Sequence, residues 1–193
     1  MKQLKKALLL ISFLTLSCAS AQNSENYEAI NVFLKTQNLE KKTYILQSDK
    51  AENKQALRVF NGGEGSDHIM DPKNPIDYTD GLFIEKHWKK MYEQYAQDTI
   101  KKYWQKEDFP GYDFRLEKGT GLTLKYDIAI KYMNTRIDNV VIISEPIYYM
   151  DKKYIMFYFE IASFAGSNRS QVVIMTKQKE KWVVVRVMGD YLF

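Results

Sequence analysis

Acidic side chains and one of the two histidines of the chain gather in a glycine-rich segment between residues 63 and 71. The candidate ligands in it are Glu64, Asp67, His68 and Asp71. Carboxylate oxygens are the ligands that Ca²⁺ prefers, and an imidazole adds affinity for a transition metal. The spacing lacks the alternating acids of an EF-hand, and acids in a surface loop also cap turns. The sequence therefore predicts a candidate metal site here, with a solvated polar loop as the alternative.

Tyrosine is unusually frequent, with fourteen tyrosines beside three tryptophans in 193 residues. Tyrosine rings bind sugars and peptides because they combine apolar area with a hydrogen-bonding hydroxyl group. The tyrosines that could share one sheet face as a ligand platform are Tyr148, Tyr149, Tyr154 and Tyr158. The alternative is that they pack beneath a helix, at the boundary between core and water.

No assembled catalytic motif is present. The Gly-x-Ser-x-Gly pattern of a nucleophile elbow is missing, and His68 and His87 are separated along the chain. Glu160 interrupts an apolar stretch, and a buried carboxylate without a partner is costly. We therefore expect it at the sheet rim or in an ion pair with Arg169 or Arg186. The sequence assigns no catalytic residue and predicts no cofactor.

Hydrophobic periodicity predicts the elements that must position these residues, and glycine and proline mark the breaks between them. Helices are predicted at Glu25–Gln37 and, as a long amphipathic helix, at Phe83–Lys106. Strands are predicted at Thr43–Gln47 and Gln55–Phe60. The stretch Asn61–Gly81, between the second of these strands and the long helix, is predicted to be an irregular loop, and loops of this length are often functional or mobile.

The remaining chain is predicted to be mostly strand. The candidate strands are Tyr112–Leu116, Thr123–Tyr132, Val140–Ser144, Tyr154–Ala162, Gln171–Thr176 and Trp182–Met188. Charged turns at Asp151–Lys153 and Lys177–Lys181 indicate hairpins, so neighbouring strands there should be antiparallel. Both faces of Tyr154–Ile161 are largely apolar, which is typical of a central strand covered on both sides. The predicted fold class is α+β, a mainly antiparallel sheet with one long amphipathic helix packed on it and a shorter N-terminal helix.

The N-terminal residues have the three-part layout of a secretory signal. Lys2, Lys5 and Lys6 precede the apolar run Ala7–Leu16, and Ala19-Ser20-Ala21 supplies the small residues of a cleavage site. The apolar run is too short to span a bilayer as a permanent helix. The predicted organisation is therefore a signal peptide at residues 1–21 and a single α+β domain at residues 22–193.

Removal of this segment changes the charge and the cysteine content. The formal net charge falls from +4 to +1, because the signal carries three lysines and no acid. A nearly neutral domain gives no support for nucleic-acid binding, which needs a clustered basic face. The single cysteine, Cys18, is also removed, which excludes disulfides, cysteine-based zinc sites and a catalytic thiol from the processed domain.

Cys18 offers a second interpretation of the N-terminus. Ser17 suits the position before a lipidated cysteine, but a lipobox prefers an aliphatic residue where Thr15 stands. Soluble export by cleavage after Ala21 is the preferred prediction. Lipidation of Cys18 is the alternative, and it is the only route by which a membrane partner is expected.

The C-terminal third resembles a group of proteins through its turn and strand pattern. The pattern begins with Ser144-Glu145-Pro146-Ile147-Tyr148, which is followed by the charged turn Asp151–Lys153 and an aromatic strand. Gly166-Ser167 comes next, and the last strand begins with Trp182-Val183-Val184-Val185. This pattern, over about residues 140–187, is similar to that of uncharacterised exported proteins of flavobacteria and their relatives. The resemblance implies export in a diderm bacterium. The group has no assigned activity, so the resemblance assigns no functional residue.

Two classes of function remain. The first is a non-catalytic exported domain, periplasmic or secreted or, if Cys18 is lipidated, held at the outer membrane, that binds an envelope protein, a peptide or a glycan. The second is a hydrolase that acts on envelope or extracellular material, in which Glu160, Asp67 or His68 would take part. A pocket with converging acids or a histidine favours catalysis, whereas an aromatic groove favours binding.

Overall fold

Strand β5 (Tyr154–Ser163) is the centre of the fold, and its apolar side chains alternate between two covered faces. The computed structural model describes residues 27–39, 42–62, 80–119, 121–135, 137, 139–164 and 169–190. In it, the six side chains from Ile155 to Glu160 are all buried. The prediction of a central strand covered on both sides is therefore confirmed.

The seven-stranded sheet is mixed, with the order β2-β1-β3-β5-β6-β7. β5 pairs antiparallel with β3 (Asn139–Ile143) on one side and with β6 (Arg169–Gln178) on the other. β6 in turn pairs antiparallel with β7 (Lys181–Asp190) through a two-residue turn. The prediction of an α+β fold with a mostly antiparallel sheet is confirmed.

The other three strands are shorter. β4 (Ile147–Tyr149), which the sequence analysis did not include, pairs antiparallel with β5 beyond the end of β3. β1 (Tyr44–Gln47) pairs parallel with both β2 (Phe114–Glu117) and β3. Parallel neighbours need crossover connections, and the connection from β1 to β2 contains the helices α2 and α3, described next.

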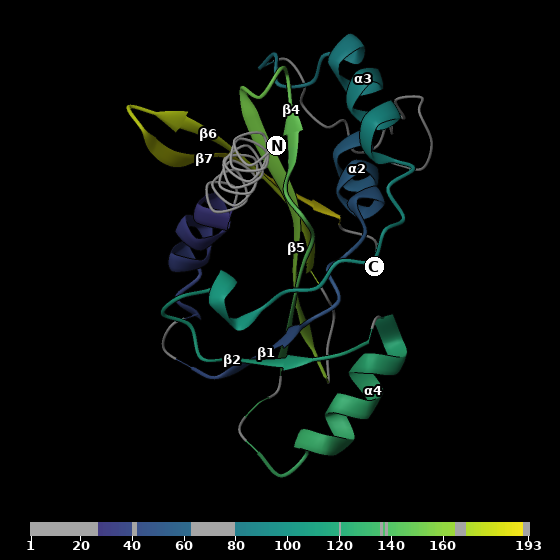
Figure 1. Cartoon of the computed structure of the whole chain (residues 1–193), viewed down its shortest axis with the longest axis vertical. Coiled ribbons are helices and arrows are strands. Elements are labelled where there is room, and N and C mark those ends of the chain that lie inside the picture. The colour runs from purple at the N-terminus through teal and green to yellow at the C-terminus, as the bar shows by residue number, and fades with distance from the viewer. Residues whose placement is uncertain are drawn as a thin grey trace, which may run out of the picture.

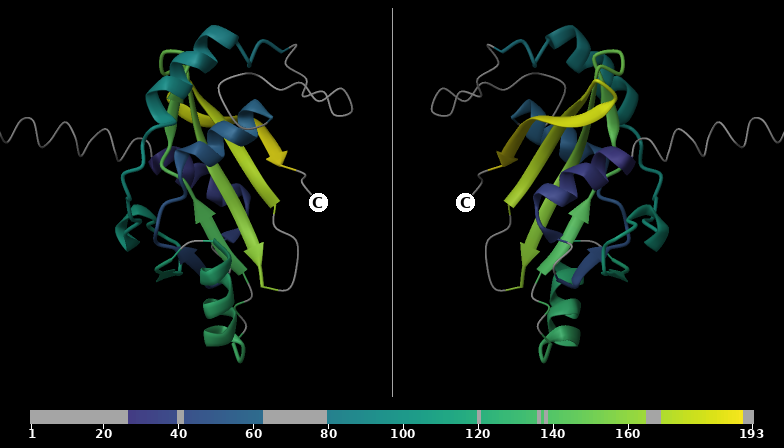
Figure 2. Two further views of the ribbon diagram at one scale, coloured as in Figure 1. Left: turned by 90° about the vertical axis from the view of Figure 1, so that its right-hand side faces the viewer. Right: turned by 90° about the vertical axis from the view of Figure 1, so that its left-hand side faces the viewer.

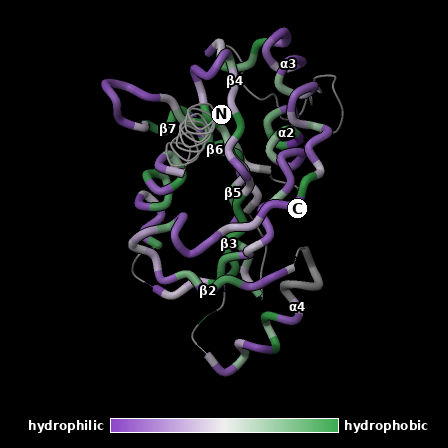
Figure 3. The backbone as a smooth tube through the Cα atoms, in the orientation of Figure 1, coloured by the Kyte–Doolittle hydropathy of each residue, from purple (hydrophilic) through white to green (hydrophobic). Residues whose placement is uncertain are grey.

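Two helical layers cover the sheet (Figure 1). α2 (Asn53–Asn61) and α3 (Glu85–Tyr95) lie on one face and pack through Phe60 and Trp88. The helical residues 27–36 lie on the other face and pack through Phe33. The two side views in Figure 2 show these opposite faces in turn. Hydrophobic residues are concentrated along the central strands between the layers (Figure 3).

The prediction of a strand at Gln55–Phe60 is wrong, because this stretch forms α2. Its buried apolar residues Ala56, Leu57, Val59 and Phe60 recur at helical spacing. Gly62 then ends the helix in the left-handed conformation, with φ 78°, and its N–H is donated to the carbonyl oxygens of Arg58 and Val59. Glycine adopts this cap geometry without the steric cost of a Cβ.

The prediction of a strand at Thr123–Tyr132 is also wrong, because this segment forms α4 (Gly121–Tyr132). Its apolar residues alternate with polar ones, as in a strand, but the backbone is helical. Ile128 and Tyr132 are buried as an i, i+4 pair. Tyr126 and Ile130 are consequently left 69% and 55% exposed on the outer side of the helix.

The long helix predicted at Phe83–Lys106 is not confirmed, since α3 ends at Tyr95. Backbone hydrogen bonds pull the following chain towards the end of β1: Lys50 N–H donates to Lys102 O, and Trp104 N–H to Ser48 O. Tertiary pairing therefore outweighs the helical periodicity. A short 3₁₀ turn, η2 (Lys106–Asp108), precedes β2.

The helix predicted at Glu25–Gln37 is helical over its described part, residues 27–36. Residues 1–26 and the expected cleavage site lie outside the described residues. Within the described part of the chain, no helix has the length and apolar character needed to cross a membrane.

Candidate functional site

One face of α3 forms the first wall of a hollow of about 450 Å³, here named the groove. The α3 residues that line it are His87, Lys90, Met91, Gln94 and Tyr95. Their spacing is i, i+3, i+4, i+7 and i+8, which places them on one helical stripe. The neighbouring residue Trp88 is fully buried and anchors the helix against the sheet, so the stripe is held in place.

β4 and the turn that follows it form the opposite wall, through Tyr148, Met150, Asp151 and Lys152. The two walls are joined by Tyr148 N–H, which donates to the hydroxyl of Tyr95 at 3.3 Å. Met150, Asp151 and Lys152 have φ values of 50°, 50° and 70°, three consecutive residues without a glycine in the left-handed region. Each such residue carries a steric cost, and strained backbone concentrates at functional sites.

The groove has a positive electrostatic character. Lys90 Nζ lies 2.6 Å from Asp151 Oδ1, and both side chains are about two-thirds exposed. The hydrogen bond and charge of Lys90 hold the pKa of Asp151 below its usual range, and the charges of His87 and Lys86 act in the same direction. The ammonium group of Lys152 lies 5.3 Å from the centre of the Tyr148 ring, within the range of a cation–π contact.

The four tyrosines predicted as a ligand platform lie on β4 and β5 but do not form one surface. Tyr148 lines the groove, whereas Tyr149 is directed to the sheet face that α3 covers, where it is buried and its backbone pairs with Tyr154. Tyr154 is half-buried beneath the ammonium group of Lys153. Tyr158 is buried as well. Of the four, only Tyr148 therefore has a place at the groove, and a ligand-binding role for all four stays a prediction.

The predicted metal ligands Glu64, Asp67, His68 and Asp71 lie outside the described residues, so the metal site also stays a prediction. Among the residues that are described, no group of three or more histidine, cysteine or acidic side chains is arranged to hold a metal ion.

Glu160 lies at a second hollow of about 380 Å³, between α2 and β5. Its carboxylate is buried and accepts a hydrogen bond of 2.5 Å from the hydroxyl of Tyr158, which also lies 2.8 Å from Ser170 Oγ. Burial and the negative charge of Glu160 raise the pKa of Tyr158, so the phenol stays protonated as a donor. The desolvation cost of the carboxylate is thus offset by this hydrogen bond.

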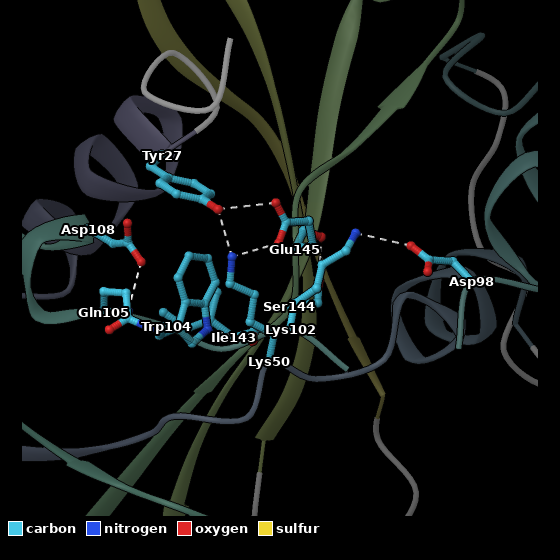
Figure 4. A network of polar contacts seen from close by, with 10 residues as sticks. All are labelled: Tyr27, Lys50, Asp98, Lys102, Trp104, Gln105, Asp108, Ile143, Ser144 and Glu145. Atoms are coloured by element: carbon cyan, nitrogen blue, oxygen red, sulfur yellow. Dashed lines mark hydrogen bonds and ion pairs between the residues drawn. The ribbon is translucent and has the colours of Figure 1, made fainter. Parts of the chain in front are cut away.

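A third polar arrangement surrounds Lys50, between β1 and α2 (Figure 4). Lys50 Nζ lies 2.6 Å from Glu145 Oε2 and 2.6 Å from the hydroxyl of Tyr27, and it sits 3.9 Å from the centre of the Trp104 ring. The indole N–H of Trp104 is donated to the carbonyl oxygen of Ile143 at 3.1 Å. We name Tyr27, Lys50, Trp104 and Glu145 the Lys50 cluster.

The Lys50 cluster joins four segments that are far apart in the sequence, and its ion pair is largely buried. The Nζ atom of Lys50 contacts a carboxylate, a phenol oxygen and an aromatic ring, as a cation does, whereas a lysine nucleophile acts as a neutral amine. Burial first, and then the charges of Glu145 and Asp108, raise the pKa of Tyr27, so this phenol also remains a donor. The cluster therefore has the chemistry of a structural anchor.

Of the residues that line the groove, sequence reasoning missed the cations Lys90 and Lys152. The i, i+3, i+4 spacing of the α3 stripe was visible in the sequence. The opposite wall was not, because it depends on the three-residue strand β4 and on the left-handed turn after it.

Comparison with known proteins assigns no relative. No family model matches the chain, and no curated protein and no solved structure matches it either. The resemblance to exported flavobacterial proteins accordingly stays a prediction.

Proposed function

We propose that this protein is an exported, non-catalytic domain of the cell envelope or the extracellular space that binds a protein, peptide or glycan ligand in the groove. The observation that carries the proposal is the strained turn at Met150–Lys152, which forms one wall of the groove. Backbone strain of this kind persists where the surrounding structure over-determines it, often at ligand clamps. Export is supported by the signal-like layout of residues 1–21.

Binding is favoured over hydrolysis by the state of the groove's ionisable groups. A hydrolase needs a base within hydrogen-bond reach of the proton it removes. Asp151 is the acid that lines the groove, and it is engaged by Lys90. The ring of His87 packs edge-on against Tyr149, with 6.3 Å between ring centres. Hydrolysis of envelope or extracellular material is the alternative function.

A site-specific photo-crosslinker tests the proposal. Placed at Gln94, an exposed residue of the groove, it should capture a ligand from the native envelope fraction. Placed at Lys179, an exposed residue of the β6–β7 turn, it should not capture the same species. Equal capture at both positions, or turnover of a hydrolase substrate by the purified protein, contradicts the proposal.

Intact-mass measurement of the processed protein tests its export. A form that begins at Gln22 supports cleavage after Ala21 and a soluble domain. A form that begins at a lipid-modified Cys18 supports a membrane-held domain instead. An uncut chain in the cytosol contradicts export altogether.

A further inference from the structure

We propose that the ligand of the groove is an acidic peptide segment, in which carboxylates contact Lys90 and Lys152 and a neighbouring apolar side chain contacts Met150. This inference rests on the proposed function, because it names the ligand class for the same groove. It follows from three observations: the sign of the charge, the state of the tyrosine faces, and the carboxylate that already occupies Lys90.

The charged groups of the groove select an anion. Lys90 and Lys152 stand on opposite walls, with His87 beside them, against the single carboxylate of Asp151. Ammonium groups on flexible stems are suited to single carboxylates, and complementary charge sets the specificity of an interface more than its affinity. A neutral or cationic ligand would leave Lys152 without a carboxylate.

The state of the aromatic rings favours a peptide over a glycan. A sugar stacks on an open aromatic face. In the groove, the face of Tyr148 is occupied by the ammonium group of Lys152, and outside it Lys153 lies 5.0 Å from the centre of the Tyr154 ring. Met150, which is partly exposed on the wall opposite α3, offers a flexible thioether that adapts to varied apolar side chains.

Asp151 occupies the position that a ligand carboxylate would take. Its Oδ1 atom lies 2.6 Å from Lys90 Nζ, and the pair bridges the two walls of the groove. Exposed ion pairs contribute little to stability, so an incoming carboxylate can replace Asp151 without a large cost. The protein therefore supplies its own weak competitor for acidic ligands.

Fluorescence anisotropy with a labelled peptide of alternating glutamate and leucine tests the inference at low salt. We expect the wild-type protein to bind this peptide and to bind its glutamine-for-glutamate counterpart much more weakly. Lys152→Gln should weaken binding about five-fold, which corresponds to the loss of one exposed ion pair. Asp151→Asn should strengthen binding about five-fold, because it removes the competing carboxylate.

The control is Lys89→Gln on the outer side of α3. Lys89 is paired with Glu85 and does not line the groove, so this variant should bind the peptide as the wild type does. The gain in affinity expected for Asp151→Asn cannot be produced by misfolding, because a poorly folded variant loses affinity for the peptide.

The inference is overturned if the peptide fails to bind, if Asp151→Asn weakens binding, or if an oligogalacturonate, an acidic glycan, binds in its place. In each of these cases, selective crosslinking at Gln94 would leave the proposed binding function standing. Failure of that crosslinking removes the proposed function itself, whatever the peptide does.

Discussion

Two lysine–carboxylate pairs in this protein have the same length and opposite surroundings. Lys50 Nζ and Glu145 Oε2 are 2.6 Å apart, as are Lys90 Nζ and Asp151 Oδ1. The side chains of the first pair are 7% and 18% exposed, whereas those of the second are 67% and 66% exposed. Length alone therefore does not indicate what a pair does.

The two pairs differ in the contacts that their charged groups make with the rest of the protein and with water. The Lys50 cluster is closed, since its ammonium contacts a carboxylate, a phenol and two aromatic faces, the second being that of Tyr27. The Lys90–Asp151 pair faces water, where a ligand can take the place of either partner. Buried ionic chemistry holds the helix at residues 27–36 to the sheet, and exposed ionic chemistry beside a strained turn is available for binding.

Removal of the buried cation is expected to have the largest effect on the free energy of unfolding. Lys50→Met keeps the length of the side chain but leaves Glu145 partly buried without its partner, and should lower the free energy of unfolding by about 3 kcal/mol. Urea unfolding followed by tryptophan fluorescence measures the loss. Glu145→Gln in the same background should restore part of it. A loss below about 0.5 kcal/mol, the range of exposed pairs, would remove the contrast between the two regions.

A smaller effect of opposite sign is expected at the strained turn. Lys152→Gly should raise the free energy of unfolding by about 0.5–1 kcal/mol, because glycine accepts φ 70° without a Cβ clash. The same change should weaken the binding of the acidic peptide.

The matched control lies in the two-residue β6–β7 turn. Lys179 has φ 49° and lies outside the groove, so Lys179→Asn should stabilise the protein in the same sense while leaving peptide binding unchanged. If Lys152→Gly destabilises the protein, the turn is not strained, and the main support for a binding role of the groove is lost.

The smallest effect is expected for the exposed pair. Lys90→Met should change the free energy of unfolding by less than about 0.5 kcal/mol. Its effect should instead be visible in the titration of Asp151 by NMR. Lys90 lowers the pKa of this carboxyl group, so the ion pair is present above that pKa and is lost as the pH falls through it. In Lys90→Met the pKa should rise towards its usual range, and an unchanged titration would argue against the pair in solution.

The long strands could be predicted because they are buried on both faces. Tyr154–Ala162 and Gln171–Thr176 are rich in β-branched and aromatic residues and are flanked by the charged turns Asp151–Lys153 and Lys177–Lys181. Both predictions are confirmed by β5 and β6. α2 was missed because its nine residues show only about two and a half turns of helical periodicity. α3 was predicted too long because the hydrogen bonds that hold Lys102 and Trp104 outside the helix come from Lys50 and Ser48, which are remote in sequence.

The site was less accessible to sequence reasoning than the fold. Tyr148 was selected for its aromatic ring, and the structure places it in the groove, but the alternation of the strand turns Tyr149 beside it into the core beneath α3. The distinction between Lys50 and Lys90 depends entirely on burial, and burial requires the packed structure.

The strand-like pattern within α4 has a consequence for the behaviour of the chain when it is not fully folded. If this helix melts, residues 122–132 can form an extended segment with one apolar and one mostly polar face (Leu-Thr-Leu-Lys-Tyr-Asp-Ile-Ala-Ile-Lys-Tyr). Extended segments with an exposed apolar face can assemble between chains as cross-β aggregates. The charges of Lys125, Asp127 and Lys131 interrupt the pattern and act as gatekeepers against such association. Expression yield and solubility at high concentration should therefore depend on these three charges more than on any residue of the groove.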